Sequence, residues 1–240
     1  MKSFLQFLKE MPQLFPSSDV GKEGDDHMSL MDHVGEMTEK YKETHSSPEI
    51  YDAGNHGDYS VTGVVHRFKG DKKIDSTGSD LADEIKRINN ADRHHFYIIH
   101  RPSGKLVGRI DGYEIKPNEI HTEFARLSPD HRGKKLMQNV YSGLIENGKT
   151  LVSSDIQTEG GAALWKGLVE KHRDTAKLRH FKGKEVPIAN MTDDQIFHAD
   201  SQDTPELSGK IGFSTKEKNE HNRMSRIVIP GLIKKKGKNK

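Results

Sequence analysis

The chain has 240 residues, a net charge of +2 and no cysteine. The absence of cysteine excludes disulfide scaffolds, thiolate zinc sites and cysteine nucleophiles. No stretch reaches the roughly 18 apolar residues of a membrane span, and the N-terminus lacks the apolar run of a secretory signal. We therefore expect a soluble protein with no membrane partner. At about 150 residues per domain, the chain forms one domain with extensions or two small domains.

The first 58 residues contain two predicted helical segments. Residues 1–25 are expected to form an amphipathic segment and a polar linker, because apolar residues recur at helical spacing before Pro16: Phe4, Leu5, Leu8 and Met11. A second helix is predicted over residues 26–44. Residues 46–58 are rich in polar residues and glycine, and we expect them to be a loop.

The pattern is sharper from Tyr59 onwards, where strands and helices alternate. Strands are predicted over residues 59–68, 95–100, 105–115, 119–127 and 150–154, with turns at 101–104 and 117–118. Helices are predicted over residues 79–90, 133–147 and 160–171. The order indicates an α/β (α+β) fold with a mixed, mostly antiparallel central sheet and helices on both faces.

The C-terminal part is less regular. Residues 178–188 and 223–230 are strand candidates, and the polar stretch between them is expected to pack partly on the surface through Ile196, Phe197, Ile211 and Phe213. We expect one domain over residues 26–230, with its best-supported core at 59–175. Residues 231–240 are a lysine-rich tail, expected to be solvated, with weak contact to nucleic acid phosphates as the alternative.

The segment LSPDHRGKKLMQNVYSGLIENG, residues 127–148, is the strongest functional signal. Pro129 ends a strand, and the basic run from Arg132 to Lys135 enters the predicted helix. Free amides in the first turn of a helix bind anions, and basic side chains add charge. The segment suits a pyrophosphate-bearing cofactor, and the alternative is a basic helix N-terminus without a ligand.

This segment, together with the order of elements over residues 59–175, resembles the GNAT family of acetyl-CoA-dependent N-acyltransferases. The resemblance implies a transferase that moves an acetyl group from acetyl-CoA, as co-substrate, to an unknown amine on a small molecule or a protein. It implies that the backbone at Leu127 pairs with the pantetheine arm and that Glu123 is the catalytic base, acting directly or through water. It assigns pyrophosphate binding to Arg132, Gly133, Lys134, Lys135, Leu136 and Met137.

The chain departs from the family pattern at three positions. Lys135 and Met137 stand where the family has small residues. Trp165 stands where many members have the tyrosine that protonates the leaving thiolate. We expect Trp165 and its neighbour Leu164 to pack in the core, with Tyr141 as a remote candidate acid. The acceptor pocket is expected to use the variable loops 46–58 and 190–220.

Two further expectations concern metal and location. The 14 histidines are scattered, and the His94-His95 pair is expected to point to opposite faces of a strand, so no metal site is predicted.

The peptide MKSFLQFLKE is similar to capsid-targeting peptides of tailed bacteriophages, which are cleaved after a triplet like Leu8-Lys9-Glu10. This similarity implies a protein of the host cytoplasm that can be packaged inside the phage capsid. The alternative function is therefore a non-enzymatic virion-internal or host-interacting protein on a degenerate GNAT scaffold.

Overall fold

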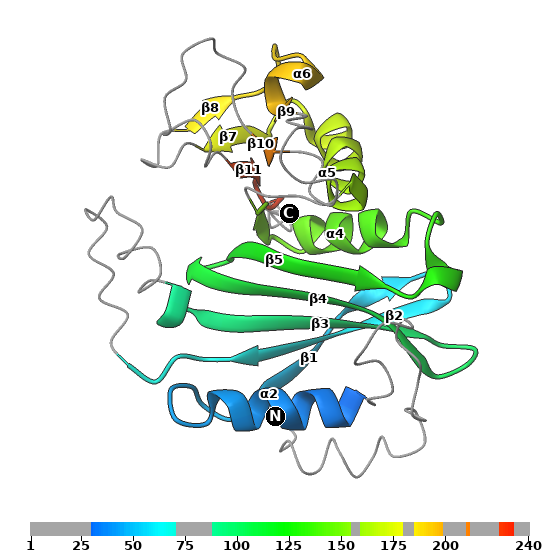
Figure 1. The fold of residues 1–240 in the computed structure, drawn as a ribbon, viewed down its shortest axis with the longest axis vertical. Coiled ribbons are helices and arrows are strands. Elements are labelled where there is room, and N and C mark those ends of the chain that lie inside the picture. The colour runs from blue at the N-terminus through cyan, green and yellow to red at the C-terminus, as the bar shows by residue number, and fades with distance from the viewer. Residues whose placement is uncertain are drawn as a thin grey trace, which may run out of the picture. The chain divides into compact units, whose positions relative to one another are not determined.

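The computed structural model describes residues 30–70, 88–154, 159–179, 185–198, 210–211 and 226–232. These residues fall into two compact units (Figure 1). Unit 1 is Met1–Ile115 with Glu123–Val140, and unit 2 is Lys116–Thr122 with Tyr141–Lys240. The predicted segment 1–25, most of the predicted helix 79–90 and the lysine tail lie outside the described residues.

Unit 1 is built on a sheet in the order β1-β2-β3-β4-β5. Its strands are β1 (Glu49–His56), β2 (Tyr59–His66), β3 (Asp92–His100), β4 (Lys105–Lys116) and β5 (Glu119–Leu127), of which the last begins in unit 2. The first four strands pair antiparallel with their chain neighbours. The predicted strands from Tyr59 to Leu127 are confirmed, because their alternating or continuous apolar residues lie buried.

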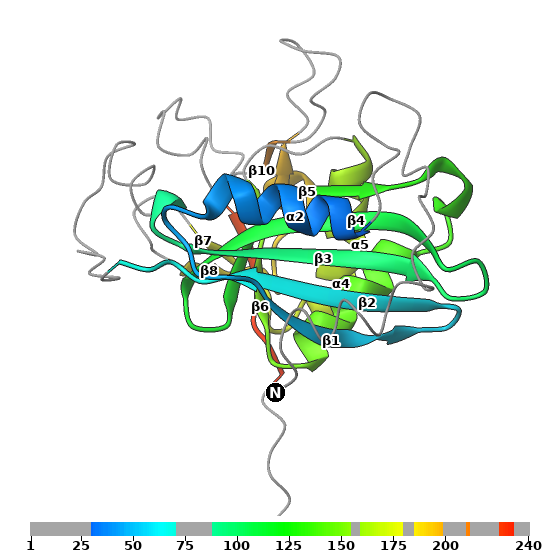
Figure 2. The same cartoon turned by 90° about the horizontal axis from the view of Figure 1, so that it is seen from below.

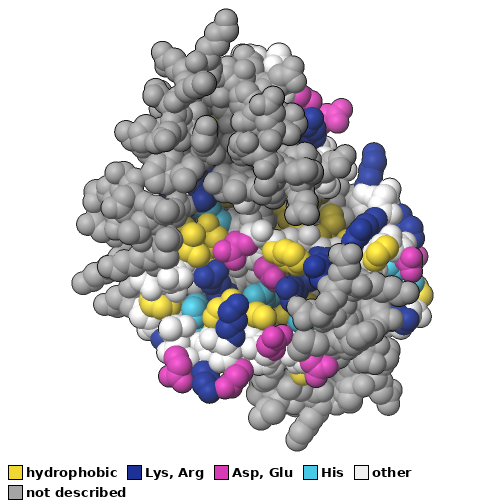
Figure 3. All heavy atoms as spheres, viewed as in Figure 1, with side chains coloured by type: hydrophobic (Ala, Val, Ile, Leu, Met, Phe, Trp, Pro, Cys, Tyr) yellow, Lys and Arg dark blue, Asp and Glu magenta, His cyan; other side chains and the backbone are white. Residues whose placement is uncertain are grey.

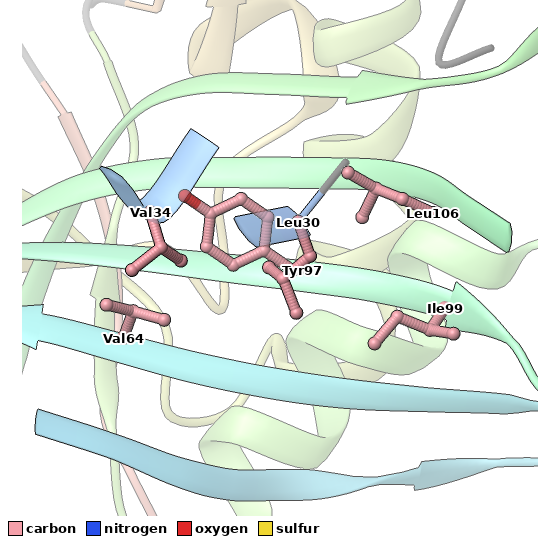
Figure 4. Packing of buried hydrophobic residues seen from close by; sticks show 6 residues of the cluster. All are labelled: Leu30, Val34, Val64, Tyr97, Ile99 and Leu106. Carbon is pink, nitrogen blue, oxygen red and sulfur yellow. The ribbon is translucent and has the colours of Figure 1, made fainter. Parts of the chain in front are cut away.

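Helix α2 (Leu30–Tyr41) covers one face of this sheet (Figure 2). Leu30 and Val34 of α2 pack against apolar residues of three strands, Val64, Tyr97, Ile99 and Leu106 (Figure 4). The predicted helix 26–44 is confirmed over Leu30–Tyr41. The first turns of α4 (Leu136–Glu146) lie on the opposite face of the sheet (Figures 1 and 2).

The prediction of a loop at residues 46–58 is wrong, because β1 occupies most of it. β1 and β2 form a hairpin whose turn is Gly57-Asp58, with a bulge between Asp52 and Gly54. A strand at the sheet edge has few buried side chains and so lacks the apolar alternation of a core strand. The ring of Tyr51 instead lies over Gly63 of β2, where a Cβ atom would come within 2.3 Å of the ring.

Unit 2 contains the order β5-β6-β11-β7-β8. Its strands are β6 (Thr150–Val152), β7 (Lys177–Arg179), β8 (Glu185–Pro187) and β11 (Arg226–Ile229), and α5 (Glu159–His172) contacts β11. β6 runs parallel to β5, so α4 is the crossover of a β-α-β unit, as predicted. The short elements α6 (Asp193–Ile196), β9 (Phe197–His198) and β10 (Lys210–Ile211) follow, with β9 and β10 paired.

One C-terminal prediction changes. Residues 178–188 were expected to be one strand, but β7 and β8 are two antiparallel strands, with Arg179 opposite Glu185. Their opposite charges form ion pairs across the hairpin, which a single strand could not make. In the polar stretch, Ile196 is fully buried as expected, and Phe197 pairs in register with Ile211. Phe213 lies outside the described residues.

The predicted class, a mixed and mostly antiparallel sheet with helices on both faces, is confirmed. Among the helices that the structure describes, none combines the length and the apolar character that crossing a membrane requires.

Candidate active site

The candidate cofactor loop follows β5 in unit 1. After Leu127, the amide of Ser128 donates to the carbonyl of Val107 (2.8 Å), and Pro129–His131 form a single 3-10 turn. Tyr59 Oη lies 2.9 Å from His131 Nδ1, which fixes this turn to β2. The loop is thus held on both sides by the sheet.

Helix α4 begins at Leu136, so the prediction of a helix from residue 133 is wrong. Gly133 and Lys135 have φ values of 74° and 55°, which an α-helix of L-residues does not contain. The first bond of the helix runs from the amide of Asn139 to the carbonyl of Lys135 (2.9 Å). The basic run is therefore a loop in front of the helix rather than its first turn.

The loop still presents an anion-binding backbone. The first amides of α4 have no acceptor within the helix, and the helix dipole places partial positive charge there. Left-handed residues alternating with other conformations curve successive amides towards one side, which makes an anion-binding concavity. Lys134 and Lys135 are both exposed beside it. The arrangement can bind a phosphate group through backbone and side chains together.

The conformation of Lys135 is the most informative single feature. A left-handed backbone costs an L-residue about 1 kcal/mol or more, and glycine is the residue that adopts it freely. The backbone at Lys135 has a conformation that glycine favours, although the side chain is that of lysine.

The other predicted cofactor residues have different roles. The Nε atom of Arg132 donates to the carbonyl of Leu127 (2.9 Å), so Arg132 closes the loop on itself. The side chain of Leu136 is 3% exposed and packs in the core, and Met137 is half-buried. The seven predicted residues run from the end of β5, at Leu127, through the loop to the first two residues of α4, where Leu136 can contribute only its backbone.

The pairing between β5 and β6 is confined to the first half of β5. β6 pairs with β5 only from Glu119 to His121, and the Thr122 hydroxyl bonds the carbonyl of Val152 (3.1 Å). Within the described ranges, no pairing with β6 continues beyond that point. Peptide groups on an unpaired strand edge can bond an extended ligand in the manner of an added strand.

Glu123, the predicted base, lies on β5 with a side chain that is 43% exposed. Its Oε2 atom is 3.2 Å from Nη1 of Arg93. The Arg93 guanidinium also donates to the carbonyl of Ile88 (3.0 Å) and stacks on the rings of Tyr41 and Tyr113. The structure gives Glu123 a cationic partner, and its catalytic role stays a prediction.

The predicted core role of Trp165 is confirmed. Its side chain is 2% exposed and contacts the ring of Tyr141 edge to face, with 5.8 Å between centroids. Leu164 beside it is half-buried. Tyr141 is itself 2% exposed, so the structure accounts for its ring by packing. Its role as an acid is not supported by this packing and stays a prediction.

Sequence reasoning missed a buried polar cluster beneath the C-terminal end of α2. His95 Nδ1 lies 2.8 Å from Asp111 Oδ1, and Arg109 Nε lies 3.1 Å from Asp111 Oδ2. His66 stands beside His95 with 5.7 Å between ring centroids. His94 points to the opposite face, as expected, and lies 3.3 Å from Glu114. A partial signal was present: His95 directly precedes the apolar run Phe96–Ile99 of β3, and Asp111 directly follows buried Ile110 of β4.

Burial controls the charge of this cluster. Burial, with the neighbouring His95 and His45, lowers the pKa of His66 to about 4, so His66 is neutral at pH 7. Burial also lowers the pKa of His45 and raises the pKa of Tyr41. In the part of the chain that the structure describes, no three His, Asp or Glu side chains form a group that could hold a metal ion.

The visible surface carries both signs of charge. On the described part of the face in Figure 3, acidic, basic and histidine side chains alternate with hydrophobic ones. Phe124 on β5 is an exposed hydrophobic side chain, and the guanidinium groups of Arg109 and Arg126 lie over its ring. The strand edge beside the loop therefore offers apolar and cationic surface together.

The chain matches no protein-family model and no curated protein sequence. Among solved structures it is similar to diaminobutyrate acetyltransferase EctA from Paenibacillus lautus, in complex with its substrate L-2,4-diaminobutyric acid and coenzyme A. The identity is 12%, the TM-score is 0.33, and the match covers 64% of this chain and 75% of that chain. So distant a likeness supports neither a substrate nor a mechanism for this chain.

Proposed function

We propose that the protein is an N-acetyltransferase that uses acetyl-CoA to acetylate an amine. The observation that carries this proposal is the left-handed backbone at Gly133 and Lys135, between the end of β5, which lies beyond the residues paired with β6, and the start of α4. A lysine in a conformation favoured by glycine is a backbone strain, and such strain is found at ligand-binding loops.

The residues of the loop fit a pyrophosphate. The amides at the start of α4 would bind its oxygens, with Lys134 and Lys135 as exposed cations beside them. The edge of β5 would pair with the pantetheine arm. The thioester that CoA supplies is open to attack by a neutral amine, and the sequence prediction gives Glu123 the role of accepting the amine proton.

Calorimetric titration with acetyl-CoA tests the proposal. We expect a Kd tighter than about 1 mM, and weaker binding would contradict the proposal. The variant K134E should lose at least about tenfold in affinity, because it places an anion beside the phosphates. K116E, at an exposed lysine at the end of β4, is the charge-matched control and should bind as the unmodified protein does.

A second candidate is a non-enzymatic protein on the same scaffold. It is favoured by Lys135 and Met137, whose side chains stand where small residues let a backbone approach phosphates. The double variant K135G/M137G separates the two candidates. If acetyl-CoA binds only to the double variant, the degenerate scaffold is the better description.

A role inside a phage particle is a separate proposal that rests on the peptide MKSFLQFLKE. It predicts that protein recovered from virions begins at Met11, as N-terminal sequencing would show. Deletion of residues 2–10 should then change the free energy of unfolding by less than about 1 kcal/mol. A clearly larger loss would mean that the segment packs on the folded protein, which contradicts a removable peptide.

A further inference from the structure

The face of the sheet under α2 changes character along the helix. Near Leu30 and Val34 it is apolar, but towards Tyr41 each of three strands contributes polar groups: His66 of β2, His95 and Tyr97 of β3, and Asp111 of β4. Figure 4 shows the Tyr97 hydroxyl at the Val34 end of the apolar cluster. We call these four residues and Tyr41 the polar chamber.

The chamber contains buried atoms that need a partner. His66, His95 and Tyr97 are at most 3% exposed. Among the described residues, both ring nitrogens of His66, Nε2 of His95 and the hydroxyl of Tyr97 have no hydrogen bond. Buried polar atoms in folded proteins are nearly always bonded to protein, water or ligand. The rings lie 5.7 Å (His66–His95) and 6.4 Å (His95–Tyr97) apart, so one polar group can serve several of these atoms.

Asp111 determines which nitrogen of His95 is free. The short contact of 2.8 Å from its Oδ1 to His95 Nδ1 requires a proton between them, which a neutral ring then carries on Nδ1. Nε2 is left with a lone pair and accepts protons. Arg109, which binds the other carboxylate oxygen and reaches Nδ1 of His33 (3.2 Å), holds Asp111 in place. A base oriented by a carboxylate in this way is typical of acid–base catalysis.

The chamber also lies close to the candidate cofactor strand. Arg109, bound to Asp111 on β4, stacks on exposed Phe124 of β5, with 5.5 Å to the ring centroid. Tyr41 is half-buried and stacks on the His95 ring, at 6.2 Å and an interplanar angle of 24°. Tyr41, whose ring is the one in the chamber that is not fully buried, therefore lies between His95 and solvent.

We propose that the polar chamber receives the amino group of the acyl acceptor and that His95 is the catalytic base; this assignment rests on the proposed function. The chemical class is a primary amine, because an ammonium group offers three N–H donors to the unpartnered acceptors of His66, His95 and Tyr97, beside aromatic rings and a carboxylate. His95 is preferred to Glu123 because Oε2 of Glu123 already binds the Arg93 guanidinium, whereas Nε2 of His95 has no hydrogen bond among the described residues.

His95 Nε2 takes a proton from the ammonium group, which frees the nitrogen lone pair. That nitrogen forms a C–N bond with the thioester carbonyl carbon, and the C–S bond breaks. The CoA thiolate leaves with the electron pair of that bond and is protonated by the His95 imidazolium, which returns His95 to its neutral form. The nitrogen, which carries a positive charge once the C–N bond has formed, releases its second proton to water and becomes the neutral amide.

The test has two arms, binding of acetyl-CoA by calorimetry and amine-dependent release of CoA thiol. Putrescine, ethanolamine and L-lysine amide are the probe amines. H95Q should bind acetyl-CoA with unchanged affinity but lose about 100-fold in kcat/KM for the amine, and the pH profile should lose one inflection. D111N, which keeps the imidazole but removes the carboxylate that orients it, should lose activity as well.

H94Q is the matched control, because His94 is also a buried histidine beside a carboxylate but faces away from the chamber. It should stay within about threefold of the unmodified protein. Thermal melts check that each variant is folded. If H95Q does not fold, the decision rests on D111N, whose altered side chain is only half-buried.

The outcomes separate the two proposals. No binding of acetyl-CoA overturns the proposed function, and this assignment with it. If acetyl-CoA binds but none of the three amines causes release of CoA thiol, the assignment is overturned and the proposed function is not. The assignment is also overturned by an H95Q protein that retains activity while E123Q loses it, or by an H94Q protein as impaired as H95Q.

Discussion

At position 66 an imidazole ring is completely enclosed, with neither nitrogen bonded to a described residue. An unpartnered buried polar atom costs about 1–3 kcal/mol, and a charged one costs more. A neutral His66 is therefore tolerated, whereas a protonated one opposes folding. The same direction of pKa shift is found at His45, His121, His131 and His172, each because of burial in the first place.

Acid should therefore destabilise the protein, and His66 should account for a defined share. The pKa of His66 is about 4 in the folded protein and ordinarily 6.5, so between these values only the unfolded chain binds the proton. Stability falls as the pH drops below 6.5 and loses about 3 kcal/mol from this group by pH 4.

Urea unfolding at pH 7 and pH 4.5 measures this share. The variant H66F keeps a ring of similar size but cannot be protonated, so its loss between the two pH values should be smaller than that of the unmodified protein. Equal losses in the two proteins would show that His66 is not the group that titrates.

The strain at Lys135 gives a second test at a single residue. K135G should stabilise the protein or leave it unchanged, because glycine accepts a φ of 55° without strain. K135A removes the same side chain but keeps the strain, and should be less stable than K135G by about 1 kcal/mol. Thermal unfolding of the pair decides, and equal stability would mean that the loop is not left-handed at this residue.

Between β5, β7 and β8 of unit 2, one arginine joins two carboxylates. Arg179 donates two bonds to Glu119 (2.7 and 2.8 Å) and further bonds to Glu185. Burial alone would raise the pKa of Glu119, but hydrogen bonds from Arg179 and His121 lower it well below its ordinary value. The three strands are thus connected by charge as well as by backbone bonds.

Removal of this arginine should be costly. R179M leaves Glu119, only 8% exposed, without its main partner, and should destabilise the protein by about 3–5 kcal/mol at pH 7. K171M, which breaks an exposed pair with Glu146, should cost under about 1 kcal/mol. Chemical denaturation measures both, and the cost of R179M should shrink in acid as the carboxylates become protonated. A cost for R179M as small as that for K171M would contradict this account.

The sequence predicts best the elements in which the spacing of apolar residues matches the spacing of buried positions. β3, β4 and α5 carry periods that follow burial, so their positions agree with the prediction to within a few residues. β1 does not, because an edge strand is half-exposed and resembles a loop in composition. The start of α4 was placed three residues too early, because a lysine gives no sign that its backbone is left-handed.

The candidate site divides in the same way. The loop from Leu127 to Met137 is contiguous, so its sequence was sufficient to locate it. The polar chamber is not contiguous, because His95 meets Asp111 only through the antiparallel register of β3 and β4. That register depends on pairing between strands, and no local pattern in either strand specifies it.

At the scale of the molecule, β5 belongs to both units. Its first residues lie in unit 2, where they pair with β6, and the rest from Glu123 lies in unit 1. The parallel pairing ends where the strand passes from one unit to the other. The candidate cofactor loop and the polar chamber both belong to unit 1, so the proposed chemistry is assigned to residues of a single compact unit.

The position of β11 has a consequence for biosynthesis. β11 lies between β6 and β7, and its residues Ile227, Val228 and Ile229 are at most 2% exposed. A nascent chain that ends before Arg226 therefore leaves β6 and β7 with exposed, unpaired edges, which favour aggregation. Expression of a chain ending at Ser225 should give insoluble protein, whereas one ending at Leu232 should stay in solution. Unit 2 can close its sheet only after the ribosome has passed Ile229, so it folds late, and a chaperone that shields strand edges would act during that interval.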